Sequence, residues 1–158
     1  GAFRANDSGK VSIYDMKYDD SAEMDPNGPL SPDAGSWLNY PKGVFAEFQK
    51  KGTKIPGFDV CLLSNVPSGG GLSSSAAFEA LFATIIESLT GEVMAPMDKA
   101  LLCQKAEHEY AGVPCGIMDQ AAVILGKSQS LLKLDCRDLS VEEVPFLNDE
   151  VCLMIIDS

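Results

Sequence analysis

The stretch Pro67-Ser68-Gly69-Gly70-Gly71-Leu72-Ser73-Ser74-Ser75-Ala76-Ala77 decides the fold, because it joins a short apolar run to a helix-forming stretch over residues 76–89. Glycine has no Cβ, so three glycines let the backbone take positive φ angles and bring N–H groups close to an anion. The free amides at the start of the following helix serve the same anion. Serine hydroxyls here are suited to capping the helix or binding Mg²⁺. The stretch therefore predicts a phosphate-binding turn.

Other phosphate-binding motifs do not fit the chain. Gly126-Lys127-Ser128 copies the end of a P-loop, but the first glycine of that motif would fall on Ala121. No G-x-G-x-x-G opens a helix, which argues against a dinucleotide-binding fold. A plain strand-to-helix turn is the alternative for the glycine stretch, although such a turn needs only one or two glycines.

Hydrophobic periodicity predicts a mixture of strands and helices. Strands are expected at residues 11–14, 59–64, 130–135, 141–146 and 151–156, and helices at 41–51, 76–89, 96–110 and from about 116. Residues 18–36 are rich in Asp, Asn, Gly and Pro and predict a long loop, and Asn148-Asp149 predicts a turn. We expect residues 1–158 to form a single two-layer α/β domain, with one sheet covered by helices.

Composition limits the classes of function. The 158 residues are 46% hydrophobic, enough for a real core, and carry a net charge of −11 with a pI near 4.4. This acidity argues against nucleic-acid or anionic-membrane surfaces as partners, because both attract basic patches. No apolar run approaches the ~20 residues of a membrane span, and no signal peptide is recognisable, so we expect a cytoplasmic protein.

The cysteines and the histidine give no sign of a metal cluster. Five cysteines occur without a C-x-x-C pair, and most lie in apolar surroundings, so they are expected to be reduced thiols of the core. His108 is the single histidine of the sequence and no cysteine stands at ligand spacing from it, which argues against zinc.

Four segments resemble the GHMP small-molecule kinases. The run from Pro67 to Ala76 is similar to the second motif of that family, and QKAEHEYAGVPCGIMDQ at 104–120 resembles galactokinases in particular. The segments 37–44, WLNYPKGV, and 134–137, LDCR, resemble galactokinases too. The resemblance extends from near residue 11 to Ser158. It implies an N-terminal, ATP-binding domain of the ribosomal protein S5 domain 2-like fold, acting in ATP-dependent phosphorylation of the C1 hydroxyl of galactose.

The resemblance assigns the sugar side of the site. Asp119 matches the aspartate that accepts the proton of the sugar hydroxyl, which is a poor nucleophile until a carboxylate orients it. The local sequence alone equally allows a capping or solvent-facing aspartate. Gly116 matches the glycine whose backbone approaches the sugar, and its alternative is an ordinary helix-start glycine.

The nucleotide side is assigned in the same way. The resemblance implies that Mg²⁺ is held by Ser75 and Glu107 between the phosphates, whereas the commoner fate of such a glutamate is a solvated helix position. Trp37 and Tyr40 match positions near the adenine, although both are equally suited to anchoring a helix in the core. The implied phosphate ligands are Gly69, Gly70, Gly71, Leu72, Ser73, Ser74 and Ser75.

Several motifs of the galactokinase pattern are missing from this sequence. The Gly-Glu-His-x-Asp-Tyr segment that grips the sugar, an arginine near the base and the C-terminal glycine-rich motif are not found, and Arg4 and Arg137 stand in other contexts. We therefore expect an internal fragment of a galactokinase, without the C-terminal domain. It should have little activity alone, and it should self-associate through the apolar surface that truncation exposes. An N-acetylgalactosamine kinase and a catalytically weak galactose- and ATP-binding regulator are the alternatives for the parent protein, while a coincidental structural module is remote.

Overall fold

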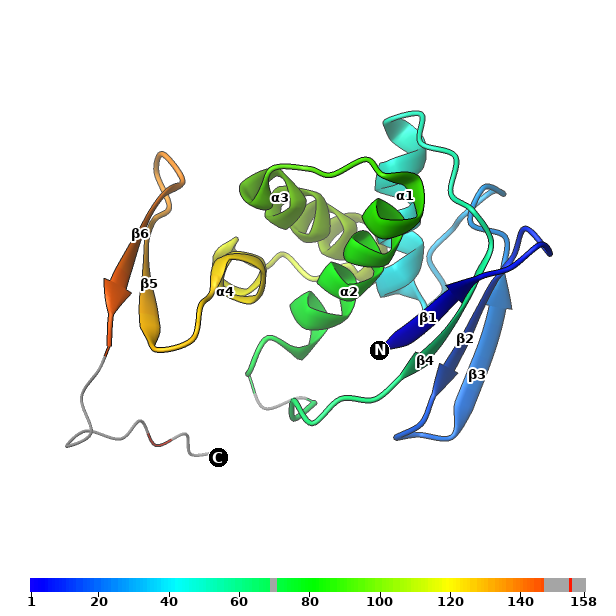
Figure 1. The fold of residues 1–158 in the computed structure, drawn as a ribbon, viewed down its shortest axis with the longest axis horizontal. Helices are drawn as coiled ribbons and strands as arrows, with labels where there is room; N and C mark the ends of the chain where they lie inside the picture. The colour runs from blue at the N-terminus through cyan, green and yellow to red at the C-terminus, as the bar shows by residue number, and fades with distance from the viewer. Residues whose placement is uncertain (69–70, 147–153, 155–158) are drawn as a thin grey trace.

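A four-stranded mixed sheet forms one layer of the molecule (Figure 1). The structure is a computed structural model that describes residues 1–68, 71–146 and 154. The strands are β1 (Ala2–Ala5), β2 (Val11–Asp15), β3 (Asp20–Met24) and β4 (Phe58–Leu62), in the order β1-β4-β2-β3. The central pair β4 and β2 is parallel, and the two outer pairings are antiparallel. A parallel pair needs a long crossover, and the chain supplies it between β3 and β4 with a helix.

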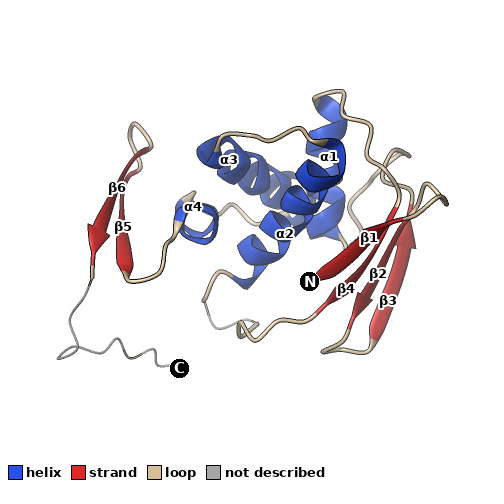
Figure 2. Ribbon diagram, viewed as in Figure 1, coloured by secondary structure: helices blue, strands red, loops and turns tan. Residues whose placement is uncertain are grey.

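Three helices form the second layer on one face of this sheet (Figure 2). They are α1 (Asn39–Lys50), α2 (Ser74–Thr90) and α3 (Pro96–Ala106). Pro96 opens α3, where its missing N–H costs nothing, and Gly91 ends α2 with a φ of 77°. The expected two-layer α/β fold is therefore confirmed.

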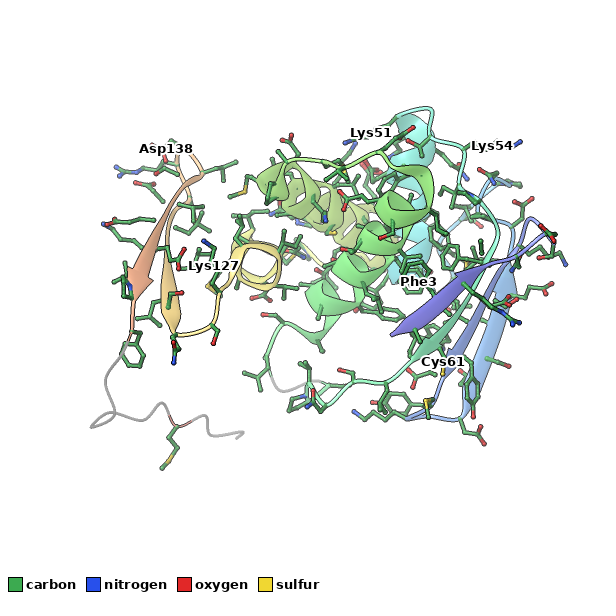
Figure 3. All side chains as sticks on the ribbon, in the orientation of Figure 1. Phe3, Lys51, Lys54, Cys61, Lys127 and Asp138 are labelled. Carbon is green, nitrogen blue, oxygen red and sulfur yellow. The ribbon has the colours of Figure 1, made fainter. Side chains whose placement is uncertain are left out.

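The core lies between these two layers, where side chains fill the space (Figure 3). Residues alternate between buried and partly exposed along β4, because one face of the strand meets the helices. Phe45 of α1, Phe58 of β4 and Phe82 of α2 are fully buried and meet at ring distances of 5.7 to 6.4 Å. These edge-on and tilted contacts fix α1 and α2 against the sheet.

A helix and a hairpin continue the chain beyond the second layer. The helix α4 (Met118–Leu125) packs on α3, and the hairpin β5 (Ser130–Asp135) with β6 (Ser140–Pro145) lies on its far side, away from the four-stranded sheet (Figure 1). The hairpin leaves Leu131 and Val144 exposed. Exposed apolar surface was expected on the sheet and helices without a stated position, and self-association through it stays a prediction.

Several expectations about local structure are wrong. The polar segment 18–36 contains β3, because pairing with β2 supplies the hydrogen bonds that its sequence does not signal, and β1 was not expected at all. The third helix ends at Ala106 and continues as a π-helix, η1 (Glu107–Ala111), in place of an α-helix to Tyr110. The strand expected at 151–156 and the turn Asn148-Asp149 lie outside the described residues.

The cysteines also differ from expectation. Cys103 is a buried core thiol, but Cys61 and Cys115 are half-buried and Cys136 is exposed in the hairpin turn. All four are free thiols, while Cys152 lies outside the described residues. Within the described part of the chain, no helix has the length and apolar character that a membrane crossing requires.

Candidate functional site

A cavity of about 660 Å³ opens between the sheet, the start of α1 and the first turns of α2. Its walls are formed by Asp15, Lys17, Tyr18, Asp20, Trp37, Tyr40, Leu62, Leu63, Ser64, Ser68, Ser74, Ser75, Ala77, Phe78 and Leu81. Four of the residues expected on the nucleotide side, Trp37, Tyr40, Ser74 and Ser75, therefore share one cavity. Apolar walls with a few convergent polar groups are typical of a small-molecule site.

Two of the aromatic residues that line this cavity, Trp37 and Tyr40, rest on α2. The rings of Trp37 and Tyr40 lie 5.9 and 6.4 Å from the ring of Phe78, which in turn packs at 5.1 Å on Phe82 of the core. Each ring thus anchors the start of α1 and also borders the cavity, while the adenine-binding role of both residues stays a prediction. Trp37 is further held by its indole N–H, which donates to Asp20 Oδ2 at 3.0 Å.

The glycine turn brings strained backbone to the edge of the cavity. Gly71 has a φ of 65°, as expected for a glycine in such a turn. Ser73 stands at the N-cap of α2 with a φ of 58°, a conformation that costs a non-glycine residue on the order of 1–3 kcal/mol and is typical of ligand sites. Its hydroxyl makes no capping hydrogen bond, so the capping role expected for a serine is wrong at this position. Gly69 and Gly70 lie outside the described residues.

The turn between β2 and β3 borders the cavity, although sequence reasoning did not predict a role for it. Tyr18 Oη donates to Ser68 Oγ at 3.1 Å, and the Lys17 ammonium lies 5.1 Å from the centre of the Tyr18 ring. These contacts tie the turn to the segment that leads into the glycines. Lys17 brings a positive charge to the cavity of an acidic chain, where an anionic ligand needs one. A lysine in a polar loop carries no motif that could have revealed it.

Glu107 lies behind the cavity, at the first position of η1. Gly43 of α1 allows this placement, since a Cβ there would stand 2.7 Å from the carbonyl oxygen of Ala106, the last residue of α3. The π-helical turn follows directly, and such turns are frequent at functional sites. Glu107 is only 4% exposed. The solvated helix position that the sequence alone favoured is therefore wrong for this residue.

Glu107 belongs to a buried acidic cluster that joins three elements, comprising Glu79 of α2, Glu107 of η1, Gln120 of α4 and Cys115. The amide Nε2 of Gln120 donates to Glu107 Oε2 at 2.6 Å and to Glu79 Oε2 at 3.4 Å. The Cys115 thiol also donates to Glu107 Oε2, at 3.3 Å. Glu79 and Gln120 are fully buried, and sequence reasoning missed both because each looks like an ordinary helix residue.

Charges in this cluster shift several pKa values. Burial, with the nearby charge of Glu107, raises the pKa of Glu79 to about 9, so this carboxyl is protonated at neutral pH. Burial and the hydrogen bond to Glu107 raise the pKa of Cys115 to about 11. Burial also raises the pKa of Tyr40, and the charges of Glu107 and Glu79 add to it, which links the cavity to the cluster behind it.

Glu107 lacks a protein cation, and this fits a bound metal ion. Among the described residues no lysine or arginine forms an ion pair with Glu107. A buried carboxylate without a partner is costly, and a divalent cation would compensate it. The described residues contain no group of three or more His, Cys, Asp or Glu side chains suited to a metal. Mg²⁺ takes one or two carboxylates and completes its shell with phosphates and water, so Glu107 is a donor that such an ion would accept.

Asp119 and Gly116 lie near this cluster rather than in the cavity wall. Asp119 is half-buried in the first turn of α4, directly before Gln120, and makes no hydrogen bond or ion pair with other described residues. Gly116 is exposed, and a Cβ there would meet no described atom within 4 Å. The fold itself therefore does not demand glycine at 116. The sugar-binding roles of both residues stay predictions.

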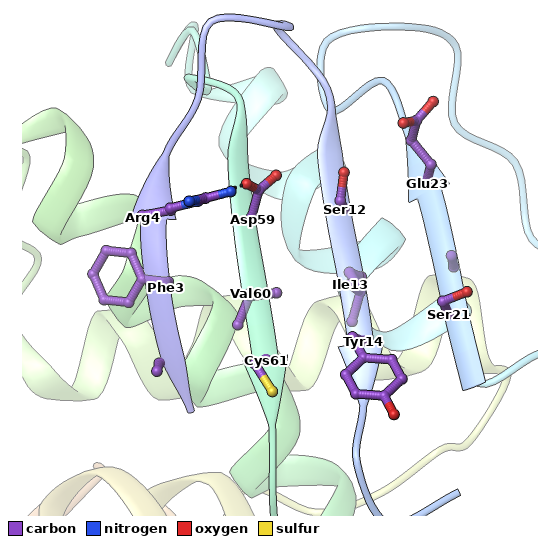
Figure 4. A pocket seen from close by; sticks show the side chains of 12 residues that line it. Phe3, Arg4, Ser12, Ile13, Tyr14, Ser21, Glu23, Asp59, Val60 and Cys61 are labelled. Atoms are coloured by element: carbon purple, nitrogen blue, oxygen red, sulfur yellow. Dashed lines mark hydrogen bonds and ion pairs between the residues drawn. The ribbon is translucent and has the colours of Figure 1, made fainter. Parts of the chain in front are cut away.

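A second cavity, of about 630 Å³, lies over the outer face of the sheet (Figure 4). It is a shallow surface across four strands. Its lining residue Glu23 pairs with Lys10, and Arg4 Nε lies 2.9 Å from Asp59 Oδ2. Both pairs satisfy their charges within the chain. No glycine turn or helix start borders this cavity, so the first cavity is the candidate site.

The sequence of this chain is similar to known proteins of one family. The sequence profile described as "GHMP kinases N terminal domain" matches residues 39–127. A galactokinase of Bos taurus is 41% identical over 130 residues, which are 82% of this chain and 33% of that protein. A galactokinase of Pyrococcus furiosus is 44% identical over 140 residues, 89% of this chain and 39% of that protein. The chain thus spans roughly a third of the length of these relatives.

Solved structures show the same relationship. The crystal structure of Lactococcus lactis galactokinase complexed with galactose superimposes with a TM-score of 0.81 at 31% identity, covering 90% of this chain and 38% of that one. The mevalonate kinase of Methanococcus jannaschii superimposes with a TM-score of 0.69 at 16% identity, covering 78% and 40%, and at that identity the likeness shows the fold alone.

Proposed function

The chain belongs to the GHMP kinase family, and from that premise we propose that the complete protein transfers a phosphoryl group from ATP to the C1 hydroxyl of galactose. One observation carries the proposal: an aromatic-lined cavity opens onto the first turn of α2, with a buried carboxylate that lacks a protein cation behind it. The names of the similar proteins, several of them galactokinases and one complexed with galactose, support galactose as the acceptor.

The cavity is suited to the nucleotide. Trp37 and Tyr40 offer aromatic faces to a purine, and both are held in place because their rings pack on Phe78. The unpaired amides at the start of α2, with the glycines and serines of 69–75, bind the phosphates. Helix amides serve an anion even in an acidic protein, and Lys17 adds a local positive charge.

The hydroxyl of Ser75 and the carboxylate of Glu107 are the two groups of this chain that would hold Mg²⁺. When bound, the ion would neutralise charge that develops on the transferred phosphoryl group. Glu107 contributes a negative charge that the chain itself leaves uncompensated, and Ser75 contributes an oxygen at the cavity wall. The cytoplasm, where ATP and Mg²⁺ are available, is the proposed location.

Asp119 accepts the proton of the sugar hydroxyl in this proposal. Its carboxylate has no partner among the described residues, so it is available to a ligand. Gly116 lies three positions before Asp119, and no described atom lies within 4 Å of where its Cβ would stand, so a sugar has room to approach there. A positioned carboxylate of this kind typically contributes 10²–10⁴-fold to the rate.

No arginine of this chain serves the site. Arg4 pairs with Asp59 on the outer sheet face, and Arg137 pairs with Asp135 in the hairpin turn. Phosphoryl transfer depends on positioned charge, so the 158-residue chain alone should release almost no ADP with galactose. Robust release by the purified chain would contradict this.

The experiment uses the complete reading frame that contains this chain. ADP release is measured with Mg-ATP and either galactose or N-acetylgalactosamine, for the unaltered protein and for Asp119→Ala. Turnover with galactose that falls by at least about 10²-fold in the variant supports the proposal. Turnover with N-acetylgalactosamine but not with galactose would mean that N-acetylgalactosamine is the substrate. Binding of galactose and ATP without turnover would indicate a regulator.

A further inference from the structure

Gln120 makes an unusual set of contacts for a buried glutamine. It is fully buried on α4, and its amide nitrogen reaches two carboxyl groups on two other elements, Glu107 Oε2 at 2.6 Å and Glu79 Oε2 at 3.4 Å. A carboxylate oxygen only accepts, so the amide must present its nitrogen and not its oxygen to Glu107. The orientation of this side chain is therefore fixed by its partners.

These contacts occupy one oxygen of Glu107 and leave the other available. Oε2 receives both the Gln120 amide and the Cys115 thiol. Oε1 has no hydrogen-bond partner among the described residues. With Oε2 tethered, the carboxylate cannot turn, and Oε1 becomes the oxygen that a cation would meet. Groups that orient a metal ligand in this way typically matter 10–100-fold for metal affinity or activity.

Glu79 is the second hydrogen-bond partner of the Gln120 amide. It lies on α2, the helix whose first turn carries Ser75, and is fully buried. Because Gln120 bridges Glu79 and Glu107, the amide links the helix that carries Ser75 to the turn that carries Glu107. Gln120 also follows Asp119, the expected base, directly in α4.

We propose that Gln120 is a positioning residue that holds Glu107 in the orientation required for binding Mg²⁺ together with Ser75. The inference rests on the proposed function, because it takes Glu107 as the metal ligand. It goes further by assigning a role to a residue whose described side-chain contacts are with Glu79, Glu107 and Cys115.

The test compares Gln120→Met with Gln49→Met in the complete protein. Methionine nearly keeps the volume and removes the amide. Gln49 is a matched control, since its amide also donates two hydrogen bonds, to the carbonyl oxygens of Pro26 at 2.7 Å and Gly28 at 3.1 Å, within α1 and the loop before it. Mn²⁺ binding in the presence of ADP is measured by electron paramagnetic resonance. Gln120→Met should weaken it about 10–100-fold, and Gln49→Met should leave it unchanged.

Kinetics provide a second readout. Gln120→Met should raise the Mg²⁺ concentration required for half-maximal rate, with the KM for galactose unchanged, and excess Mg²⁺ should restore part of the rate. A merely structural loss would lower the amount of active protein without changing the metal requirement. If Gln120→Met does not fold, Gln120→Asn keeps the amide but shortens its reach, and it should weaken Mn²⁺ binding as well.

Glu107→Gln separates the two levels of the argument. If it abolishes Mn²⁺ binding while Gln120→Met and Gln120→Asn bind Mn²⁺ normally, the positioning role is wrong and the proposed function stands. If Glu107→Gln itself binds Mn²⁺ normally, Glu107 is not the ligand, and the positioning role falls together with the metal assignment.

Discussion

Two pairs of buried glutamates differ in what surrounds them. Glu47 and Glu87 are 6% and 5% exposed, and each has a lysine partner: Lys105 Nζ lies 3.0 Å from Glu47, and Lys99 pairs with Glu87. Glu79 and Glu107 are 0% and 4% exposed, and among the described residues neither has a lysine or arginine partner. Glutamates of similar burial therefore differ in whether a lysine compensates their charge.

The difference separates structural from functional charge. A glutamate paired with a lysine carries its compensation within the fold, and its role is complete when the chain has folded. The second pair is compensated differently: Glu79 holds a proton, and Glu107 is left to a ligand. We infer that the lysine-paired glutamates stabilise the helices, whereas Glu107 binds the cation.

The largest expected effect comes from Glu107→Gln in the complete protein. A metal ion contributes several kcal/mol to the stabilisation of the transition state, so turnover should fall by at least about 10²-fold. The variant should remain folded and keep or raise its thermal midpoint, because it removes an uncompensated buried charge. Turnover assays and thermal unfolding check both parts. A lower thermal midpoint with unchanged turnover of the folded protein would mean that Glu107 is a structural residue.

Glu87→Gln should show the opposite pattern. It leaves Lys99, itself largely buried, without its partner, and breaking a buried pair costs about 3 kcal/mol. Chemical denaturation should therefore show a lower midpoint, while kcat of the folded protein stays close to that of the unaltered protein. An unchanged midpoint would mean that the lysine-paired glutamates are not structural.

The expected effect of Glu79→Gln depends on pH. In the folded protein the carboxyl has a pKa of about 9, against an ordinary value of 4.5. Between these values the folded state holds a proton that the unfolded state lacks, so the free energy of unfolding decreases as pH rises. Glutamine has no such proton to hold. The variant should therefore gain more stability at pH 8 than at pH 5, by about 4 kcal/mol, as thermal midpoints at both pH values would reveal. An equal gain at the two values would contradict this.

The smallest effect is expected for Glu109→Ala. Glu109 is the exposed neighbour of the buried Glu107 and forms surface ion pairs with Lys50 and Lys105. Such pairs contribute about 0.5 kcal/mol and weaken with salt, so the denaturation midpoint should move little. Mn²⁺ binding should not change. A large loss of metal binding would mean that the ligand was assigned to the wrong glutamate of η1.

The sequence predicted the second layer better than the sheet. The helices α1 and α2 were expected within two residues of their observed starts, since their apolar positions recur at helical spacing. The strands β1 and β3 were missed, because they pair at the sheet edges and β3 is largely polar. Edge pairing depends on distant partners, which local sequence does not reveal.

The candidate site was predicted unevenly for a similar reason. The glycine turn and Trp37 belong to contiguous motifs, and the structure brings Trp37, Tyr40 and Ser75 to one cavity. Glu79 and Gln120 stand 41 positions apart, and nothing in their local surroundings distinguishes them from solvated helix residues. Their importance follows from burial and from the contact of α2 with α4, which only the folded chain supplies.

An anomalous-scattering experiment tests the central claim most directly. Crystals of the complete protein are grown with ADP and Mn²⁺, and the manganese position is located from its anomalous signal. The account predicts a manganese peak within coordination distance of Glu107 Oε1, with the Gln120 amide still hydrogen-bonded to Oε2. A peak bound by the phosphates and other side chains, with Glu107 outside its coordination shell, would contradict it.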